Sequence, residues 1–330
     1  MRLKNKNLSS TCKLEVSVLI YTGIRRKDVE FAIKFPYKVG IVTFTVFPEL
    51  QKSDVGAADK IKILAEDQYF DLLEVGLISD AEWNKLMDYV KKLGRPINFA
   101  LGLQPEILVR KYNPNAINEE ERKKAEEVLV KGVEVAGTRG MCAIAMCSGP
   151  IVPEEQKEKA IQAFIKTAGA LAMKASEYKI PLYIETFDTR WDKKRLIGPI
   201  GMAAKIIEEI RKSYNNVYLM WDLSHAPLLD EKPEDLKPYA DLIGHIHIGC
   251  AKRVDDKLYD WHPGFYRPGA INTEYEIAKL LEVLDEIKYK GAISFEVKPE
   301  EGQHPLEVVN AAKGVLLRAY QIFIEGKYLR

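Results

Sequence analysis

Short apolar runs alternate with longer amphipathic segments along most of the chain. From about residue 38 onward, eight short runs are each followed by a segment in which apolar residues recur every three or four positions. Eight alternating strands and helices are typical of an α/β protein with a closed parallel sheet, so the pattern predicts a (β/α)8 TIM barrel. The predicted strands are residues 39–47, 71–75, 97–101, 141–146, 180–186, 217–221, 242–248 and 292–297.

The helical segments carry signals of their own. The clearest covers residues 154–178, where Ile161, Phe164, Ala168 and Leu171 fall on one stripe that is expected to pack against the barrel. Two segments begin with a capping side chain followed three positions later by glutamate, a spacing that predicts a helix N-terminus. These pairs are Ser79 with Glu82 and Asn118 with Glu121.

No linker or low-complexity tract divides the chain. A last amphipathic segment over residues 305–323 fits a helix that closes the barrel. We therefore expect a single barrel domain over residues 37–330, preceded by an extension of residues 1–36. The role of the extension stays open between an element under the barrel, an interface arm and a lid.

Composition limits the partners of the protein. Lys and Arg (49) nearly cancel Asp and Glu (48), so no broad positive surface favours nucleic acid. No apolar run is long enough to span a bilayer, which argues against a membrane protein. The four cysteines show neither zinc-ribbon spacing nor the density of a disulfide scaffold. These features predict a cytoplasmic protein.

Polar residues at the ends of the last four strands form a candidate metal site. They are Glu185 in YIET, Asp222 in LMWD, His247 in HIHIG and Glu296 in SFEV. The carboxyl ends of barrel strands meet at one opening, where three carboxylates would repel one another unless a cation neutralises them. Mixed oxygen and nitrogen ligands suit an open divalent site, so we predict Mn²⁺, with Mg²⁺, Co²⁺ and Zn²⁺ as alternatives.

Two histidines in the seventh strand differ in predicted depth. Strand alternation turns His245 and His247 to the barrel interior and Ile246 and Ile248 to the helices. His247 lies nearer the catalytic end and is the predicted ligand. His245, one layer deeper, is expected to hydrogen bond to another interior group instead of binding the metal.

Several other polar residues are candidate substrate contacts. His225 follows Asp222 by one turn, and Gln104 and Lys298 lie just after other strands. Asp260 and His262 form an Asp-x-His pair after the seventh strand, either as a self-bonded loop, as substrate contacts or on a second metal. Glu74 and Ser148 are less specific candidates for substrate-facing groups, and Thr43 and Thr45 are expected only to fill barrel layers. The loop after Glu185 is basic and either binds an anion or is simply solvated; its cations are Arg190, Lys193, Lys194 and Arg195.

The order of a strand-end Glu, Asp-x-x-His, His-x-His and a final strand-end Glu resembles the xylose isomerase-like barrel superfamily. That superfamily includes sugar-phosphate isomerases and epimerases, ketose 3-epimerases and endonuclease IV. The resemblance spans roughly residues 38–325 and implies a metal on the four strand-end residues, with Glu185 and Glu296 as the acid/base pair. It further implies substrate contacts from His225 and Arg253, while Cys250 stands where ketose 3-epimerases commonly carry Glu.

The chemistry expected from these groups is proton transfer beside a ketone. A bound divalent ion stabilises an enediolate, and two carboxylates remove and return the proton. The resemblance therefore implies a metal-dependent sugar or sugar-phosphate isomerase or 3-epimerase, and members of the superfamily often form homodimers or homotetramers. The alternatives are a keto-sugar or inositol-derivative dehydratase or lyase, a phosphodiesterase of the endonuclease IV type, and a non-catalytic binding protein. No histidine precedes His225, which disfavours the phosphodiesterase.

Overall fold

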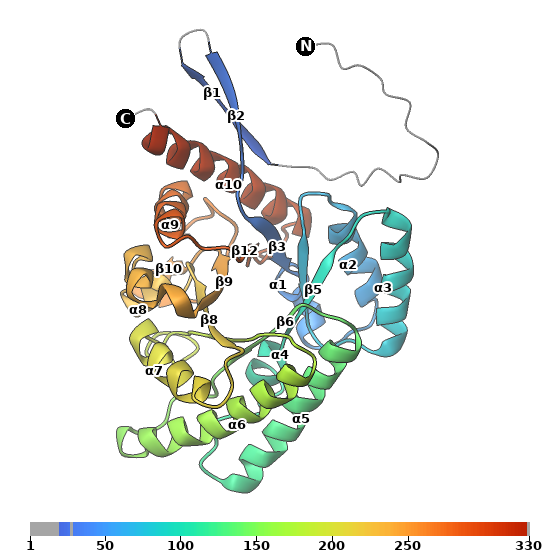
Figure 1. Cartoon of the computed structure of the whole chain (residues 1–330), viewed down its shortest axis with the longest axis vertical. Helices are drawn as coiled ribbons and strands as arrows, with labels where there is room; N and C mark the ends of the chain where they lie inside the picture. Colours follow the sequence, from blue (N-terminus) through green and yellow to red (C-terminus); the bar gives the residue numbers. More distant parts are fainter. Residues whose placement is uncertain (1–19, 27–28, 329–330) are drawn as a thin grey trace.

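Eight parallel strands close into a barrel in the order β12-β3-β4-β5-β6-β7-β8-β9 (Figure 1). The structure is a computed structural model that describes residues 20–26 and 29–328. It confirms the predicted TIM barrel. The barrel strands are β3 (Lys38–Val42), β4 (Leu72–Val75), β5 (Asn98–Gly102), β6 (Ala143–Cys147), β7 (Leu182–Glu185), β8 (Val217–Asp222), β9 (Ile243–Ile248) and β12 (Ala292–Phe295).

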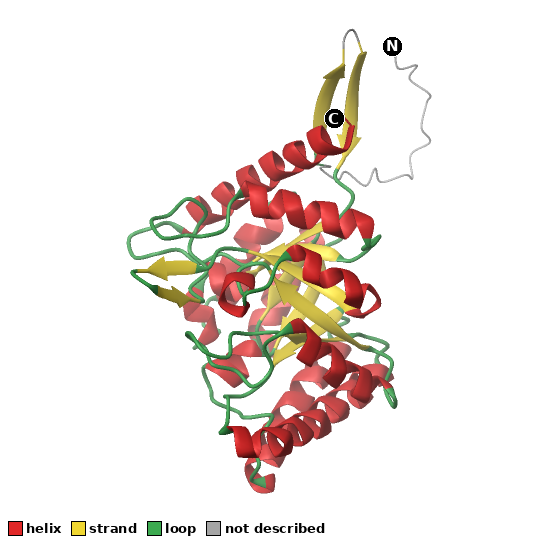
Figure 2. Cartoon of the chain, turned by 90° about the vertical axis from the view of Figure 1, so that its left-hand side faces the viewer, coloured by secondary structure: helices red, strands yellow, loops and turns green. Residues whose placement is uncertain are grey.

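Helices surround the barrel and cover its outer face (Figures 1 and 2). The long ones are α2 (Ala57–Glu66), α3 (Asp80–Leu93), α5 (Glu119–Thr138), α6 (Lys157–Glu177), α7 (Ile200–Arg211), α9 (Glu274–Glu286) and α10 (Pro305–Tyr328). Between β8 and β9 the connection is instead the short helix α8 (Ala226–Leu229) and the 3-10 segment η3 (Pro233–Leu242). Pro238 lies inside η3 and has no N–H, so this segment cannot continue as a regular α-helix.

Both predicted helix caps are present. The Ser79 hydroxyl accepts a hydrogen bond from the Glu82 backbone N–H at 3.5 Å, and the Asn118 amide oxygen accepts one from the Glu121 N–H at 3.0 Å. The helix predicted over residues 154–178 begins with the 3-10 turn η2 (Glu154–Gln156) before α6. Local sequence therefore decides where these helices start.

The first barrel strand is shorter than predicted. Of the apolar run over residues 39–47, only the part up to Val42 belongs to β3, and the next residues form the one-turn helix α1 (Thr43–Val46). Thr43 Oγ1 donates to a backbone carbonyl of β4 and Thr45 Oγ1 donates to the Val42 carbonyl, each at 2.9 Å. The interpretation of these threonines as barrel-layer residues was wrong, because the chain turns at the barrel rim where their hydroxyls hold the turn.

The described part of the N-terminal extension is a β-hairpin. Strands β1 (Tyr21–Arg26) and β2 (Val29–Lys34) pair antiparallel and project beyond the barrel beside α10 (Figures 1 and 2). Phe35 at its base packs edge-on against Tyr320, with ring centroids 5.0 Å apart, and the Tyr320 hydroxyl donates to the Lys34 carbonyl at 2.7 Å. The hairpin is thus attached to the last helix, while residues 1–19 lie outside the described residues.

The core lies mainly between the barrel wall and the helices. Ile246 and Ile248 of β9 point into it and are fully buried, as strand alternation predicted. Across residues 20–26 and 29–328, no helix combines the length and apolarity needed to cross a membrane.

Candidate active site

The structure brings together the four residues predicted to bind a metal. Glu185 ends β7, Asp222 ends β8, His247 lies in β9 and Glu296 directly follows β12. Asp222 and His247 are also direct partners in the β8–β9 pairing. One donor atom from each of the four residues lies within 4.8 Å of the other three. Neighbouring strand ends therefore produce a compact cluster of three carboxylates and one imidazole.

This cluster fits a divalent cation. Glu185, Asp222 and His247 are at most 1% exposed, so their charges lie in a poorly solvated space. Glu185 Oε1 is buried and has no hydrogen-bond partner among the described residues. A buried carboxylate oxygen without a partner is costly, and several such charges repel one another. A cation would satisfy the unpaired oxygen and neutralise the cluster.

The two glutamates differ in their protonation preference. Burial raises the pKa of Glu185 above its usual value. Burial also acts to raise the pKa of Glu296, but His262 and His247 outweigh it and lower that pKa. Environments that separate the pKa values of two close carboxyl groups are typical of acid/base pairs.

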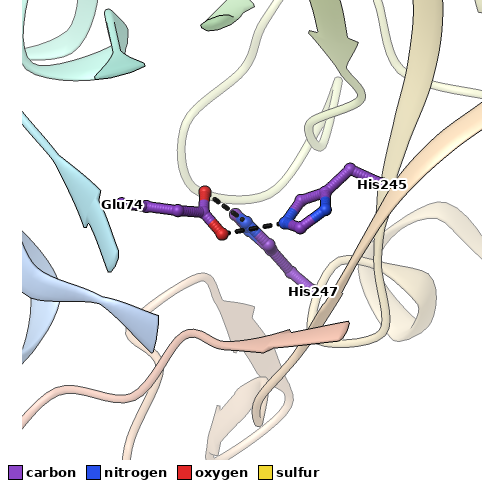
Figure 3. A group of neighbouring side chains, drawn as sticks. All are labelled: Glu74, His245 and His247. Atoms are coloured by element: carbon purple, nitrogen blue, oxygen red, sulfur yellow. Dashed lines mark hydrogen bonds and ion pairs between the residues drawn. The ribbon is translucent and has the colours of Figure 1, made fainter. Parts of the chain in front are cut away.

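The two nitrogen atoms of His247 face different partners. Its Nδ1 lies 2.8 Å from Glu296 Oε2 and 3.7 Å from Glu185 Oε1, within the ligand cluster. Its Nε2 lies 3.0 Å from Glu74 Oε2, and the other Glu74 oxygen lies 2.8 Å from His245 Nε2 (Figure 3). His245 thus hydrogen bonds one layer below His247, as predicted. The prediction that Glu74 faces substrate was wrong, because Glu74 lies beneath the cluster and binds the two histidines.

A second group of polar side chains adjoins the first. Asp222, His225 and His262 each supply a donor atom within 4.8 Å of the others. Asp260 Oδ1 lies 2.6 Å from His262 Nε2 and 3.2 Å from His225 Nε2, while His225 Nδ1 lies 2.7 Å from the Thr186 carbonyl. The Asp-x-His loop therefore packs onto the candidate metal cluster and is more than a self-bonded loop.

Both histidines of this second group favour the charged form. Burial lowers the pKa of His225, but Asp260 and Asp222 raise it well above its usual value. For His262, burial is again outweighed, and Asp260 and Glu296 raise its pKa to about 9. The surrounding carboxylates thus favour positive charge throughout this end of the barrel.

A cavity of about 260 Å³ adjoins both groups. Its lining includes Gln104, Lys193, Asp260, His262, Glu296 and Lys298. Lys193 Nζ donates to the Asp260 carbonyl at 2.7 Å and pairs with Asp192 at 2.8 Å. The cavity can admit a small polar molecule beside the carboxylate cluster.

Two predicted substrate contacts have partners within the protein. The Gln104 amide donates to Glu185 Oε2 at 2.7 Å, so it holds that carboxylate from the side of the cavity. The buried Ser148 hydroxyl accepts a hydrogen bond from the Ile197 N–H at 2.9 Å. Ser148 is absent from the residues that line the described cavity, so its role as a substrate-facing group is not supported.

Arg253 lies outside this cavity. It belongs to a short hairpin of β10 (Lys252–Val254) and β11 (Lys257–Tyr259), where its side chain is exposed. Its backbone N–H donates to the Gly269 carbonyl at 2.7 Å. Arg253 is therefore not among the residues that line this cavity.

The basic segment after β7 does not act as one patch. Arg190 is exposed and pairs with Asp230 at 2.6 Å, and Arg195 is buried. Of the four cations in this segment, Lys193 alone is among the residues that line the described cavity. The segment therefore supplies one cation to the candidate site.

Phe187 is a cavity residue that the sequence analysis missed. Its ring packs against the imidazole of His225, with centroids 4.4 Å apart. It follows Glu185 by two positions, and this spacing was the available signal that it faces the same opening. Gln51, at the end of the 3-10 helix η1 (Pro48–Gln51), and Trp261, in a loop, also line the cavity but belong to no such strand-end pattern.

Known proteins of similar structure share the barrel. D-psicose 3-epimerase from Clostridium cellulolyticum H10, solved with D-tagatose, matches with a TM-score of 0.60 and 18% identity over 87% of this chain and 97% of that one. A family 2 AP endonuclease from Brucella melitensis matches with a TM-score of 0.63 and 18% identity over 84% and 98%. The IolI protein with a bound zinc atom matches with a TM-score of 0.62 and 16% identity over 87% and 99%.

Sequence comparison gives the family. No curated protein sequence matches the chain significantly. The family model described as xylose isomerase-like TIM barrel, however, matches residues 65–317, which is most of the barrel. The chain belongs to the xylose isomerase-like TIM barrel family.

Proposed function

We propose that the protein is a divalent-metal-dependent sugar or sugar-phosphate isomerase or 3-epimerase. The proposal depends above all on the convergence of Glu185, Asp222, His247 and Glu296 beside a polar cavity. The similarity to a ketose 3-epimerase supports the substrate class, and the similarity to a zinc-bound barrel supports a metal.

The proposed metal is Mn²⁺, with Mg²⁺, Co²⁺ or Zn²⁺ as alternatives. Glu185, Asp222, His247 and Glu296 would hold it, since their donor atoms already lie within 4.8 Å of one another. When bound, a divalent ion would polarise a ketone oxygen and a neighbouring hydroxyl, which acidifies the adjoining C–H and stabilises an enediolate.

Glu185 and Glu296 are the proposed acid/base pair. One carboxylate accepts the proton from the carbon next to the ketone, and the other donates a proton back. Return to the same carbon from the opposite face gives epimerisation, and return to the adjacent carbon gives isomerisation. The Gln104 amide, 2.7 Å from Glu185 Oε2, orients one member of the pair.

The remaining polar residues of the cavity are proposed to bind substrate hydroxyl or phosphate groups. They are His225, Asp260, His262, Gln104 and Lys298. Asp260, His262, Gln104 and Lys298 line the cavity, and His225 contacts Asp260 from below. Arg253 is not part of this set, because it is exposed on the β10–β11 hairpin.

A dehydratase or lyase acting on a keto-sugar or inositol derivative is the second candidate, since it would use the same cluster and the same proton abstraction. A phosphodiesterase is less favoured. The endonuclease IV type needs histidines on early strands, but Glu74 stands near the end of β4 and Gln104 just after β5, and no histidine precedes His225 in the sequence.

The group of Asp222, His225 and His262 could hold a second ion, which metal stoichiometry would reveal.

The test is solvent deuterium incorporation, followed by NMR, into a panel of free and phosphorylated ketoses and keto-inositols. Mn²⁺-loaded wild type is compared with Glu185→Gln and Glu296→Gln, and with Glu301→Gln as a control at an exposed position. We expect exchange at a carbon next to the carbonyl in the wild type and the control, and its loss in both site variants. A metal-loaded wild type that exchanges no panel member would contradict the proposal and favour a hydride-shift isomerase, another lyase substrate or a binding role.

A further inference from the structure

Beneath the candidate metal cluster, one buried carboxylate joins two histidines. Glu74 belongs to β4 and is 3% exposed, and it meets residues of β9 inside the barrel (Figure 3). Its Oε1 lies 2.8 Å from His245 Nε2, and its Oε2 lies 3.0 Å from His247 Nε2. Each imidazole therefore has its own carboxylate oxygen.

This contact gives the Nε2–H of His247 an acceptor outside the candidate metal cluster. An ionised carboxylate only accepts hydrogen bonds, so Glu74 favours an N–H at Nε2. Nδ1 also faces carboxylate oxygens, Glu296 Oε2 at 2.8 Å and Glu185 Oε1 at 3.7 Å. A cation that takes the place of the proton at Nδ1 would therefore leave the Nε2–H bonded to Glu74. A metal ligand needs a free lone pair, and the hydrogen bond at the other nitrogen fixes both tautomer and ring orientation.

His245 holds Glu74 in place. It donates to the second oxygen of Glu74, and its ring stacks on Tyr183 with centroids 5.6 Å apart and planes at 3°. The carboxylate is thus held by two adjacent imidazoles, whose ring centroids lie 5.1 Å apart.

We propose that Glu74 is a positioning residue of the metal site and that His245 is its support, so that together they set the affinity of the site for the divalent ion. The inference rests on the proposed function only in requiring that the cluster binds a metal. Glu74 lies outside the lining of the substrate cavity, so it acts through His247 and does not touch substrate.

A separate cavity of about 140 Å³ at the opposite end of the barrel reaches Glu74 and His245. Small residues leave this space open, namely Ala100, Ala143 and Ala292. Cys142 lines the same space. A polar substitution at Glu74 or His245 can therefore be accommodated without displacing tightly packed neighbours, which makes these positions suitable for mutation.

The same three side chains could instead hold an ion of their own, because their donor atoms lie within 4.8 Å of one another. His247 would then bind two ions through both nitrogens and would have to lose its last proton. The two separate hydrogen-bond distances to Glu74, 2.8 and 3.0 Å, favour a carboxylate that positions the imidazoles. Metal stoichiometry distinguishes the two arrangements.

The experiment titrates the metal-free full-length protein with Mn²⁺ and follows free Mn²⁺ by electron paramagnetic resonance. The variants are Glu74→Gln, His245→Gln, His245→Leu and the control Cys142→Ala, which changes the same cavity without touching a ligand. We expect Glu74→Gln to weaken Mn²⁺ binding by about 10- to 100-fold. His245→Gln keeps an N–H donor for Glu74 and should bind more tightly than His245→Leu, while Cys142→Ala should match the wild type.

The outcomes separate this inference from the proposed function. Wild-type affinity in Glu74→Gln, with deuterium exchange intact, overturns the positioning role alone. Loss of one of two Mn²⁺ equivalents in Glu74→Gln, with the other unchanged, makes Glu74 a ligand of a second ion and also overturns it. Failure of the wild type to bind Mn²⁺ in this titration, and Mg²⁺, Co²⁺ and Zn²⁺ in parallel calorimetric titrations, overturns both proposals. If thermal unfolding shows that Glu74→Gln is not folded, equal affinities of the two His245 variants overturn the role.

Discussion

His225 Nδ1 lies 2.7 Å from the backbone carbonyl oxygen of Thr186. A carbonyl only accepts, so Nδ1 carries the hydrogen and the ring is held from the end of the fifth barrel strand. Its Nε2 then points to Asp260, 3.2 Å away, and to Asp222, 3.7 Å away. The backbone carbonyl of Thr186, just after β7, thus orients His225, which follows β8.

Two substitutions of His225 should measure how much its hydrogen bond to the Thr186 carbonyl contributes to stability. In His225→Asn the amide can take the place of Nδ1–H and donate to Thr186, whereas His225→Ala leaves a buried carbonyl without a donor. We expect His225→Ala to lower the free energy of unfolding by about 1 to 3 kcal/mol more than His225→Asn. Urea unfolding in the presence of EDTA measures the difference. Equal stability of the two variants would show that the Thr186 bond contributes little.

His262 should make the stability of the metal-free protein depend on pH. Burial lowers its pKa, but Asp260 and Glu296 raise it to about 9, above the unfolded value of 6.5. A pKa raised on folding contributes stability that is complete below 6.5 and is lost as pH rises through about 9. The shift corresponds to roughly 3 kcal/mol.

Urea unfolding with EDTA at pH 6.5 and pH 9.5 tests this expectation. The wild type should lose stability between the two pH values, and His262→Gln should show a flatter dependence. His304→Gln, at an exposed position, controls for the loss of a histidine elsewhere. The same pH dependence in the wild type and His262→Gln would argue against a buried charged pair between His262 and Asp260.

The two helix caps should differ in strength. The Asn118 cap bond is 3.0 Å long, and the Ser79 cap bond is 3.5 Å long. We expect Asn118→Ala to cost about 1 kcal/mol of unfolding free energy and Ser79→Ala less, because the longer bond contributes less. Thermal and urea unfolding of both variants give the comparison. A larger cost for Ser79→Ala would mean that its hydroxyl has a further role.

These caps belong to the part of the molecule that the sequence could predict. A cap depends on residues three positions apart, and the inward direction of His247 depends on alternation within one strand. The convergence of Glu185 and Glu296 follows once the barrel is assumed, because all strand carboxyl ends meet at one opening. Short-range patterns and one correct topology were therefore sufficient to predict that the four residues of the candidate metal cluster converge.

Other features depend on contacts that no local pattern contains. The partner of Glu74 is His245, 171 positions away, and its depth in the barrel depends on the stagger of strands. The end of β3 was misplaced because an apolar run such as residues 39–47 suits a buried strand or a buried helical turn equally well. Arg253 lies in the β10–β11 hairpin, which is separate from the barrel sheet, so strand alternation in the barrel does not predict its position.

The buried thiols of the native protein should not react with a thiol reagent. Cys147 and Cys250 are buried and Cys142 is exposed, although burial raises the pKa of all three thiols. In a Cys12→Ser background, we expect a disulfide reagent to modify Cys142 in the native protein and the other two only after unfolding. Adding Cys142→Ser should abolish native labelling. Rapid native reaction of the double variant would show that one buried thiol becomes accessible.

Gln104 offers a test of how the proposed acid/base pair is oriented. Its amide donates to Glu185 Oε2 at 2.7 Å, and a hydrogen bond to a charged group contributes about 1.5 to 3 kcal/mol. If Gln104 acts by orienting Glu185, then Gln104→Met should slow the deuterium exchange of saturating substrate by about 10- to 100-fold with little change in KM. Gln321→Met, on α10, is the matched control. A raised KM at unchanged kcat would instead assign Gln104 to substrate binding, because a hydrogen bond that stabilises the bound substrate and the transition state equally does not change kcat when it is removed.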